Sequence, residues 1–291
     1  MPPAVTLDVR FWGTRGSVPS PGPTTVRYGG NTPCLELRTP TGARVILDAG
    51  TGVRALGQAM AASGEAPRDV DIYLSHLHWD HVQGIPFFTP IFQHGTRLVV
   101  WSGAPADAEE VLRGQMAPRV FPVPFSETAA TIRFCSADAT ERRGDGYSVR
   151  ATSVRHPGGA LGLRFAAEPG LVGGVVYIPD NELDAATPYD DEPGWRDRLV
   201  AFVRGARLLV HDAMYTPSEA PARRGWGHSS YAEAVHLALD AEVETLALFH
   251  HHPERADGEV DAIVVECRRL VAAARRPLTV IAAAEGLRLS V

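Results

Sequence analysis

The stretch LSHLHWDHVQG (residues 74–84) crowds His76, His78, Asp80 and His81 into one short segment. A hydrophobic core explains this crowding poorly, because each buried polar side chain would need a partner. Imidazole and carboxylate groups are, in contrast, the ligands that suit zinc and similar divalent metals. In an extended segment His76 and His78 point the same way and can reach one ion, whereas Asp80 and His81 follow a bend and can reach a second. The motif therefore predicts a metal site, with a solvated histidine-rich turn as the alternative.

Strand-like and helical patterns alternate around this motif. We expect strands within residues 6–13, 34–50, 69–75, 96–102, 131–137, 147–155, 162–168, 173–180, 206–213, 243–252 and 277–291, and helices within residues 53–63, 105–116, 194–205, 229–241 and 259–276. Strand runs on both sides of the helical segments predict two sheets with helices outside them, in one α/β domain over residues 1–291.

Polar residues follow directly where several of the apolar strand-like runs stop. They are His76, His156, Asp180, His211 and His250. Loops at strand ends are where sheet-based folds build binding and catalytic sites on a rigid platform. The recurrence of histidine and aspartate at these junctions predicts that they share one site.

The composition excludes several classes of protein. The 291 residues carry a net charge of -6, which argues against a chain whose main task is to grip a polyanion. No segment approaches the roughly 18 apolar residues of a membrane span, and the N-terminal residues show no secretory signal. The three scattered cysteines do not form a disulfide framework or a thiolate metal site. We therefore expect a cytoplasmic protein without a membrane partner.

The motif SHLHWDH resembles the signature of the metallo-β-lactamase superfamily. Members of this superfamily fold as an αββα sandwich, in which two mixed sheets are flanked by helices and the metal site lies at one edge. Further matches are GTRGSVP and ILDAGTG before the motif, His156 in VRHPGGALGLRF, Asp180 in VVYIPDNE, His250 in LALFHHHPER and the closing AAAEGLRLSV. The resemblance therefore extends over nearly the whole chain.

The resemblance implies two divalent ions, zinc in the first place, with manganese or iron also compatible with the ligands. One ion would be held by His76, His78 and His156, the other by Asp80, His81 and His250, and Asp180 would lie between them. Such a centre leaves room for a bridging water or hydroxide, and Asp80 is expected among the catalytic residues as well as among the ligands. Two cations lower the pKa of that water and stabilise charge on the attacked group. His251 and His252 are rival ligands for the second ion.

Two further motifs resemble the ribonuclease Z-like phosphodiesterase branch, which includes enzymes that act on cyclic nucleotides. These are HDAM (residues 211–214) and HSS (residues 228–230), where the branch has His-Glu-Ala-Thr and His-Ser-Thr. Aspartate replaces glutamate here, which keeps the carboxylate but shortens its reach. We assign His228 as the general acid for an alkoxide leaving group and Asp212 as the residue that orients it. The alternative is that Ser229 or Ser230 caps the following helix and His228 is incidental.

The substrate is expected to be compact. Ribonuclease Z carries a long tRNA-binding arm between its third histidine and its bridging aspartate, whereas only residues 157–179 separate them here. A small nucleotide-like phosphodiester, such as a cyclic nucleotide, is therefore the leading substrate, and no stable nucleic-acid partner is expected. Residues 85–127 are rich in phenylalanine and proline and could form a cap in which Phe87 and Phe88 wall a pocket. Apolar packing of these rings against the domain is the alternative.

Weaker signals concern residues around the metal motif. Arg15 and Asn31 lie in glycine-rich stretches and are expected to reach the substrate. Asp48 is expected to orient the histidine loop, with capping of helix 53–63 as the alternative. His211 is expected to support the site or simply to pack at a strand end. A homodimer is possible, and a lactonase or thioesterase, a ribonuclease Z-like RNA endonuclease and a non-catalytic metal-binding module remain alternative functions.

Overall fold

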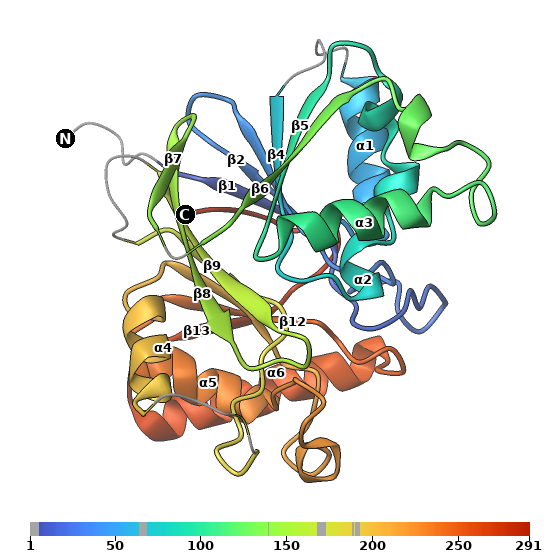
Figure 1. Cartoon of the computed structure of the whole chain (residues 1–291). Helices are drawn as coiled ribbons and strands as arrows, with labels where there is room; N and C mark the ends of the chain where they lie inside the picture. Colours follow the sequence, from blue (N-terminus) through green and yellow to red (C-terminus); the bar gives the residue numbers. More distant parts are fainter. Residues whose placement is uncertain (1–5, 64–68, 139, 168–172, 188, 190–192) are drawn as a thin grey trace.

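A computed structural model describes residues 6–63, 69–138, 140–167, 173–187, 189 and 193–291. Two seven-stranded sheets lie face to face in it, and helices cover their outer faces (Figure 1). Among the described residues, no helix has the length and hydropathy needed to cross a bilayer.

The N-terminal sheet has the strand order β14-β1-β2-β3-β4-β5-β6. Its strands are β1 (Asp8–Gly13), β2 (Cys34–Arg38), β3 (Arg44–Leu47), β4 (Asp69–Tyr73), β5 (Arg97–Ser102), β6 (Thr131–Ser136) and β14 (Arg288–Ser290). The pairs from β14 to β3 are antiparallel, and those from β3 to β6 are parallel. Parallel neighbours need a crossover connection. Helices α1 (Gly52–Ala62) and α3 (Pro105–Gln115) supply it after β3 and after β5.

The C-terminal sheet has the order β13-β12-β11-β10-β9-β8-β7. Its strands are β7 (Arg142–Gly144), β8 (Tyr147–Val154), β9 (Ala160–Ala167), β10 (Val175–Ile178), β11 (Leu208–Asp212), β12 (Thr245–Phe249) and β13 (Thr279–Ala282). It is antiparallel from β7 to β10 and parallel from β10 to β13. Helices α4 (Trp195–Val203), α5 (Tyr231–Asp240) and α6 (Asp257–Ala274) lie against it (Figure 1).

Three hydrophobic clusters hold these layers together. The central cluster joins the inner faces of the two sheets through residues such as Phe11, Leu163 and Phe249. The other two lie between each sheet and its helices. Strands β10 and β11 are buried along their whole length because both faces of this parallel region are covered. The predicted αββα sandwich of two mixed sheets is therefore confirmed.

Residues 85–127, the segment expected as a possible cap, belong for the most part to the N-terminal layer. They contain β5, which pairs with β4 and β6, and α3, which packs on that sheet. The short 3-10 turns η1 (Ile85–Phe87), η2 (Thr89–Phe92) and η3 (Phe125–Glu127) complete the segment. Phe88 is fully buried in the cluster beneath α1, so it is a core residue and not the wall of a substrate pocket. Phe87 is 57% exposed and packs edge-on against Phe121.

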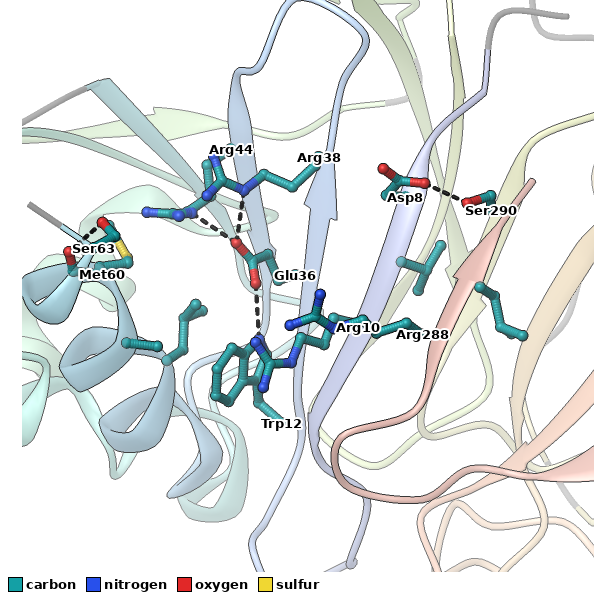
Figure 2. Close-up of a pocket in the computed structure, with 14 residues that line it drawn as sticks. Asp8, Arg10, Trp12, Glu36, Arg38, Arg44, Met60, Ser63, Arg288 and Ser290 are labelled. Atoms are coloured by element: carbon teal, nitrogen blue, oxygen red, sulfur yellow. Dashed lines mark hydrogen bonds and ion pairs between the residues drawn. The ribbon is translucent and has the colours of Figure 1, made fainter. Parts of the chain in front are cut away.

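A cavity of about 490 Å³ opens on the outer face of β14, β1 and β2 beside α1 (Figure 2). At its base the buried carboxylate of Glu36 accepts hydrogen bonds from Trp12 Nε1 at 3.0 Å, Arg38 Nε at 3.0 Å and Arg44 Nε at 2.7 Å. The guanidinium of Arg10 lies 3.7 Å from the centre of the Trp12 ring. We call this cavity the Glu36 pocket. Its central carboxylate is bonded to groups of the protein itself.

Candidate metal centre

The seven predicted metal ligands come together where four strands end. They follow β4, β8, β10 and β12 in the chain, and one short helix, α2 (Trp79–Val82), carries part of the motif. Their ligand atoms form three groups in which all atoms lie within 4.8 Å of one another. The first group is His76, His78 and His156, and the second is Asp80, His81 and His250. The third, His76, His81 and Asp180, connects these two. Six of the seven residues are buried, and His78 is exposed. The structure thus assembles the two pairs of the motif into one cluster.

Asp180 lies between the two halves of this cluster. Its Oδ1 atom is 3.2 Å from His81 Nε2 and 3.3 Å from His250 Nε2. Its Oδ2 atom is 3.7 Å from Nε2 of both His76 and His156. One carboxylate oxygen therefore faces each half, which is the position that the resemblance implied for a bridging ligand.

The cluster leaves buried polar atoms without partners. His76 Nε2, His81 Nε2 and Asp180 Oδ1 are inaccessible to solvent and form no hydrogen bond with any described residue. A buried polar group left in this state costs roughly 1–3 kcal/mol. A divalent cation would satisfy all three atoms, since neutral imidazole and carboxylate are suitable ligands for it. The residues present therefore fit divalent metal binding.

The electrostatics of the cluster favour the same ligand states. Burial lowers the pKa of His156 to about 4, and burial together with the neighbouring His81 lowers the pKa of His76 well below its ordinary value. Burial would raise the pKa of Asp180, but His250 and His81 hold it well below its usual range. At neutral pH His76 and His156 are thus neutral and Asp180 is ionised, which are the states that metal binding requires.

His81 differs from the other ligands because three carboxylates surround it. Burial would lower the pKa of His81, but Asp80, Asp180 and Asp48 raise it well above its ordinary value. A proton on His81 supplies the positive charge that these carboxylates require. Metal binding at His81 therefore competes with this proton.

Asp48 holds His81 and the start of the motif in place. Its Oδ2 atom accepts hydrogen bonds from His81 Nδ1 at 2.8 Å, Ser75 Oγ at 2.8 Å and Tyr177 OH at 2.7 Å, and Oδ1 accepts one from Ser75 N at 2.7 Å. A carboxylate in this position fixes the ring orientation and leaves Nε2 for the metal. The position of Asp48 matches the expected orienting role, because its oxygens are engaged with the motif and not with the first turn of α1, which begins after Thr51.

Backbone strain is concentrated at this centre. Ser17, Asp48 and His250 have positive φ values of 62°, 58° and 57°. The N–H of Ser17 donates to Asp80 Oδ2 at 2.7 Å, so all three residues act on the cluster. At Gly16 a Cβ atom would come within 2.3 Å of His250 Nδ1, which explains the glycine. Left-handed conformations of non-glycine residues are held in place only by the surrounding structure, and they gather at functional sites.

The expected pair of Asp212 and His228 forms at the rim of the cluster. His228 Nδ1 lies 2.9 Å from Asp212 Oδ2, and it is 3.8 Å from Asp180 Oδ2. Asp212 is itself fixed, because Oδ2 accepts the N–H of Ser229 at 3.1 Å and Oδ1 accepts that of Met214 at 2.9 Å. The shorter aspartate side chain therefore still reaches the histidine.

The capping role falls to a neighbour of His228. Ser230 caps α5 in a capping box with Glu233, and Ser229 Oγ donates to the carbonyl of Asn181. His211 is fully buried; its Nδ1 donates to the Asp212 carbonyl at 2.7 Å and its Nε2 lies 3.2 Å from Asn181 Nδ2. His211 therefore supports the strand end that carries Asp212.

Arg15 and Asn31 do not reach the cluster with their side chains, contrary to expectation. The guanidinium of Arg15 is fully buried and donates to the carbonyls of Gly29, His252 and Arg255. Asn31 Nδ2 donates to Glu285 Oε2 at 2.9 Å. Both side chains join loops that are distant in sequence, because backbone carbonyls in a buried loop crossing need donors.

Of the three consecutive histidines, His250 is the one in the cluster. His251 Nε2 donates to the carbonyl of Ala283 at 2.8 Å, and His252 packs near the ring of Tyr215. The positive φ of His250 turns its side chain away from the directions of its neighbours. This arrangement agrees with the choice of His250 over His251 and His252.

Two tryptophans beside the centre were missed in the sequence. Trp79 lies between His78 and Asp80 and is 71% exposed, and Trp226 precedes Gly227 and His228 and is 62% exposed. The available signal was their position inside or next to the chemical motifs. A cavity of about 510 Å³ also adjoins His76 and His78, between Ser102–Ala104 on one side and residues 157–161 on the other.

Comparison with known proteins agrees with this geometry. Residues 43–251 match the model of the beta-lactamase superfamily domain. Ribonuclease Z of Natronomonas pharaonis is 28% identical over 286 residues, covering 84% of this chain and 87% of that protein. The crystal structure of unliganded yeast PDE1 matches 99% of this chain and 100% of that chain, with a TM-score of 0.72 and 14% identity. The metallo-β-lactamase fold protein YhfI of Bacillus subtilis matches 98% of this chain and 100% of its own, with a TM-score of 0.71 and 16% identity.

The family model covers more than half of the chain, and the structural matches show the same fold over nearly all of it. The similarity to ribonuclease Z confirms the predicted branch. The chain therefore belongs to the metallo-β-lactamase superfamily of metal-dependent hydrolases.

Proposed function

We propose that the protein is a dinuclear metal-dependent phosphodiesterase that acts on small nucleotide-like phosphodiesters. The observation that carries this proposal is the Asp212–His228 pair at the rim of the ligand cluster, with His228 Nδ1 2.9 Å from Asp212. A phosphodiester releases an alkoxide, which needs a proton, and a histidine held by a carboxylate is suited to supply it. A lactonase or thioesterase would use the metal ligands without needing this pair.

Each residue of the centre has a definite task in this proposal. Bound divalent ions would supply positive charge for the attacked phosphate and a nucleophile at neutral pH. His76, His78 and His156 would hold one ion, Asp80, His81 and His250 the other, and Asp180 would contact both. The remaining residues position these ligands and the acid.

His228 holds the proton for the leaving group. Its Nδ1 faces Asp212, which leaves Nε2 to carry the proton that the leaving oxygen receives. Burial would lower the pKa of His228, but Asp212 raises it to about 9, which favours the imidazolium form in the absence of bound cations. The stack of His228 on His250, with ring centres 4.9 Å apart, keeps this proton next to the cluster.

An RNA endonuclease is the second candidate, and the similarity to ribonuclease Z favours it. Against a tRNA substrate, only residues 168–174 connect β9 to β10 between the third histidine and the bridging aspartate. A long tRNA-binding arm of the kind described above is thus absent from this interval of the sequence.

A substrate panel tests the proposal. The zinc- or manganese-loaded protein is assayed on bis-p-nitrophenyl phosphate, cyclic nucleotides, short oligonucleotides, a precursor tRNA, a lactone and a thioester, with metal content measured on the same sample. We expect phosphodiester turnover to exceed ester turnover, and small substrates to exceed tRNA. Absence of phosphodiester turnover in a sample with two ions per chain would overturn the proposal, and preferential tRNA cleavage would favour the second candidate.

A further inference from the structure

We propose that Trp79 and Trp226 are stacking platforms for the two nucleobases on either side of the scissile phosphate. The substrate would then be a linear, unpaired dinucleotide segment and not a cyclic mononucleotide, which carries only one base. This inference rests on the proposed phosphodiesterase function and names its substrate class.

The two tryptophans lie at opposite ends of one chain of contacts through the metal centre. Trp79 directly follows His78 in the sequence, and the Nδ1 atom of His78 lies 2.9 Å from His156 Nε2. On its other side, His156 donates from Nδ1 to the carbonyl of Gly227 at 2.9 Å, and Gly227 is bonded to Trp226. Trp79 is therefore next in sequence to one of the first set of ligands, His78, and Trp226 is next to Gly227, which contacts another, His156.

The backbone that presents Trp226 is fixed by a buried carboxylate. Glu182 is 2% exposed, and its oxygens accept the N–H groups of Gly225 at 2.9 Å and Gly227 at 2.8 Å. Both glycines have left-handed φ values, 81° and 84°, and a Cβ atom at Gly227 would meet His156 Nδ1 at 2.0 Å. The backbone of this glycine-tryptophan-glycine turn is therefore fixed, and it carries the 62% exposed side chain of Trp226 two residues before His228.

Trp79 is held outward by the residues that follow it. It is the first residue of α2, whose turn is closed by bonds from His81 N to the His78 carbonyl at 3.0 Å and from Gln83 N to the Trp79 carbonyl at 2.8 Å. Asp80 and His81 are buried in the ligand cluster, so the backbone on the C-terminal side of Trp79 is fixed by the metal motif. The Trp79 side chain is 71% exposed on this fixed backbone.

A nucleobase is the occupant that fits this arrangement. Large exposed aromatic side chains next to a binding site indicate a ligand surface, because a tryptophan in water gains nothing from its apolar area. Every base has a π face, and stacking on an aromatic side chain accepts any base. Divalent ions held by the cluster would take the charged phosphate, and the indoles would take the neutral rings on both sides.

Binding of a non-hydrolysable dinucleotide tests the inference. Calorimetry on the zinc-loaded protein compares the methylenephosphonate analogue of dithymidine, which keeps the negative charge, with its counterpart that lacks both bases, for the wild type, Trp79→Ala, Trp226→Ala and Trp79→Phe. We expect each alanine variant to lower the ratio of dinucleotide to abasic affinity by about 5- to 30-fold, and Trp79→Phe to retain most of it. Val120→Ala is the matched control, since Val120 is 68% exposed in the loop after α3, and its ratio should not change.

The outcomes separate this inference from the proposed function. A ratio that is unchanged in both alanine variants, while the same protein still hydrolyses methyl p-nitrophenyl phosphate, overturns the inference and leaves the phosphodiesterase intact. The affinity for 3′,5′-cyclic thymidine monophosphate is measured with the same variants. If both alanine variants lower this affinity as much as they lower the affinity for the dinucleotide, the inference of a linear substrate is overturned. A dimer that becomes monomeric on either substitution, seen by sedimentation, identifies the tryptophans as a subunit contact and overturns base stacking. Failure to hydrolyse any phosphodiester with two ions bound concerns the proposed function instead.

Discussion

Two regions of the molecule bury charged groups, and they treat these groups in opposite ways. In the Glu36 pocket the carboxylate is bonded to Trp12, Arg38 and Arg44 (Figure 2). In the metal centre His81 Nε2 and Asp180 Oδ1 are equally inaccessible but form no hydrogen bond with any described residue. A buried polar group must be satisfied by the protein or by a ligand. The first region is therefore complete as it folds, whereas the second requires a cation.

Backbone conformation separates the same two regions. Glu36 and Arg44 lie in regular strands and belong to the outward-facing series of their alternating pattern. The metal centre instead uses Asp48 and His250 in the left-handed region. A regular sheet can build an ion-pair network with no strain, but it cannot aim seven ligands from four loops at one point.

Removal of a metal ligand should have the largest effect on metal content and activity, and it tests the contrast between the two regions. His76→Ala takes one ligand from the first site, so we expect fewer than two ions per chain and a loss of roughly 10³-fold in kcat/KM. Elemental analysis and turnover of bis-p-nitrophenyl phosphate measure the two effects. The control is Glu36→Gln, which should retain the metal and most activity; if Glu36→Gln lost both equally, the contrast between the two regions would be wrong.

Loss of the acid should have the next largest effect. His228→Ala removes the proton donor but none of the seven ligands, so kcat should fall about 10²-fold for poor leaving groups and much less for p-nitrophenolate. The measurement is kcat over a series of aryl and alkyl phosphodiesters with both ions bound. An equal loss across the series would contradict the acid role and assign His228 to the support of the centre.

Metal affinity should respond more moderately to Asp48. Asp48→Ala removes the acceptor of His81 Nδ1 and of Ser75, and loss of such an orienting partner weakens metal binding about 10- to 100-fold. Competition with a chelator measures this affinity. Tyr177→Phe is the paired variant, because it removes only one donor to Asp48. If Tyr177→Phe were as damaging as Asp48→Ala, the effect would arise from general repacking and not from the orientation of His81.

Sequence patterns gave most of the fold because burial determines them directly. The apolar run of β10 and the alternation in β1 reflect which faces are covered. Strand β7, with the sequence RRG, carries no such pattern and was missed. The metal ligands could be predicted for a related reason. Each follows a recognisable strand, and strands that run in the same direction end at one edge of the sheet.

Contacts between distant loops could not be predicted in this way. Arg15 was expected at the substrate, but its guanidinium meets the carbonyls of His252 and Arg255, which lie at the other end of the sequence. Phe87 ends the short 3-10 turn η1 and Phe88 follows it directly, and so short a segment has no periodic pattern that distinguishes the two rings. Packing beneath α1, where a Cβ at Gly57 would come within 2.9 Å of Phe88, decides which ring is buried.

The smallest effect we expect concerns the stability of the Glu36 pocket. Glu36→Gln keeps the shape of the side chain but removes the negative charge that faces Arg44 at 2.7 Å, whose side chain is 9% exposed. Because the pocket is open to solvent, the cost should be about 1–2 kcal/mol in the free energy of unfolding, less than for a fully enclosed pair. Urea unfolding of the metal-free protein measures it without the contribution of bound ions.

The same assay applies to His81→Ala, which removes a protonated imidazole from among three carboxylates and should therefore also destabilise the metal-free protein. Added zinc should raise the stability of Glu36→Gln. It should not restore the stability of His81→Ala, because that variant lacks a metal ligand. If zinc restored the stability of both variants equally, cation binding would not depend on His81. The contrast between the Glu36 pocket, which is satisfied by protein groups, and the metal centre, which needs a cation, would then be wrong.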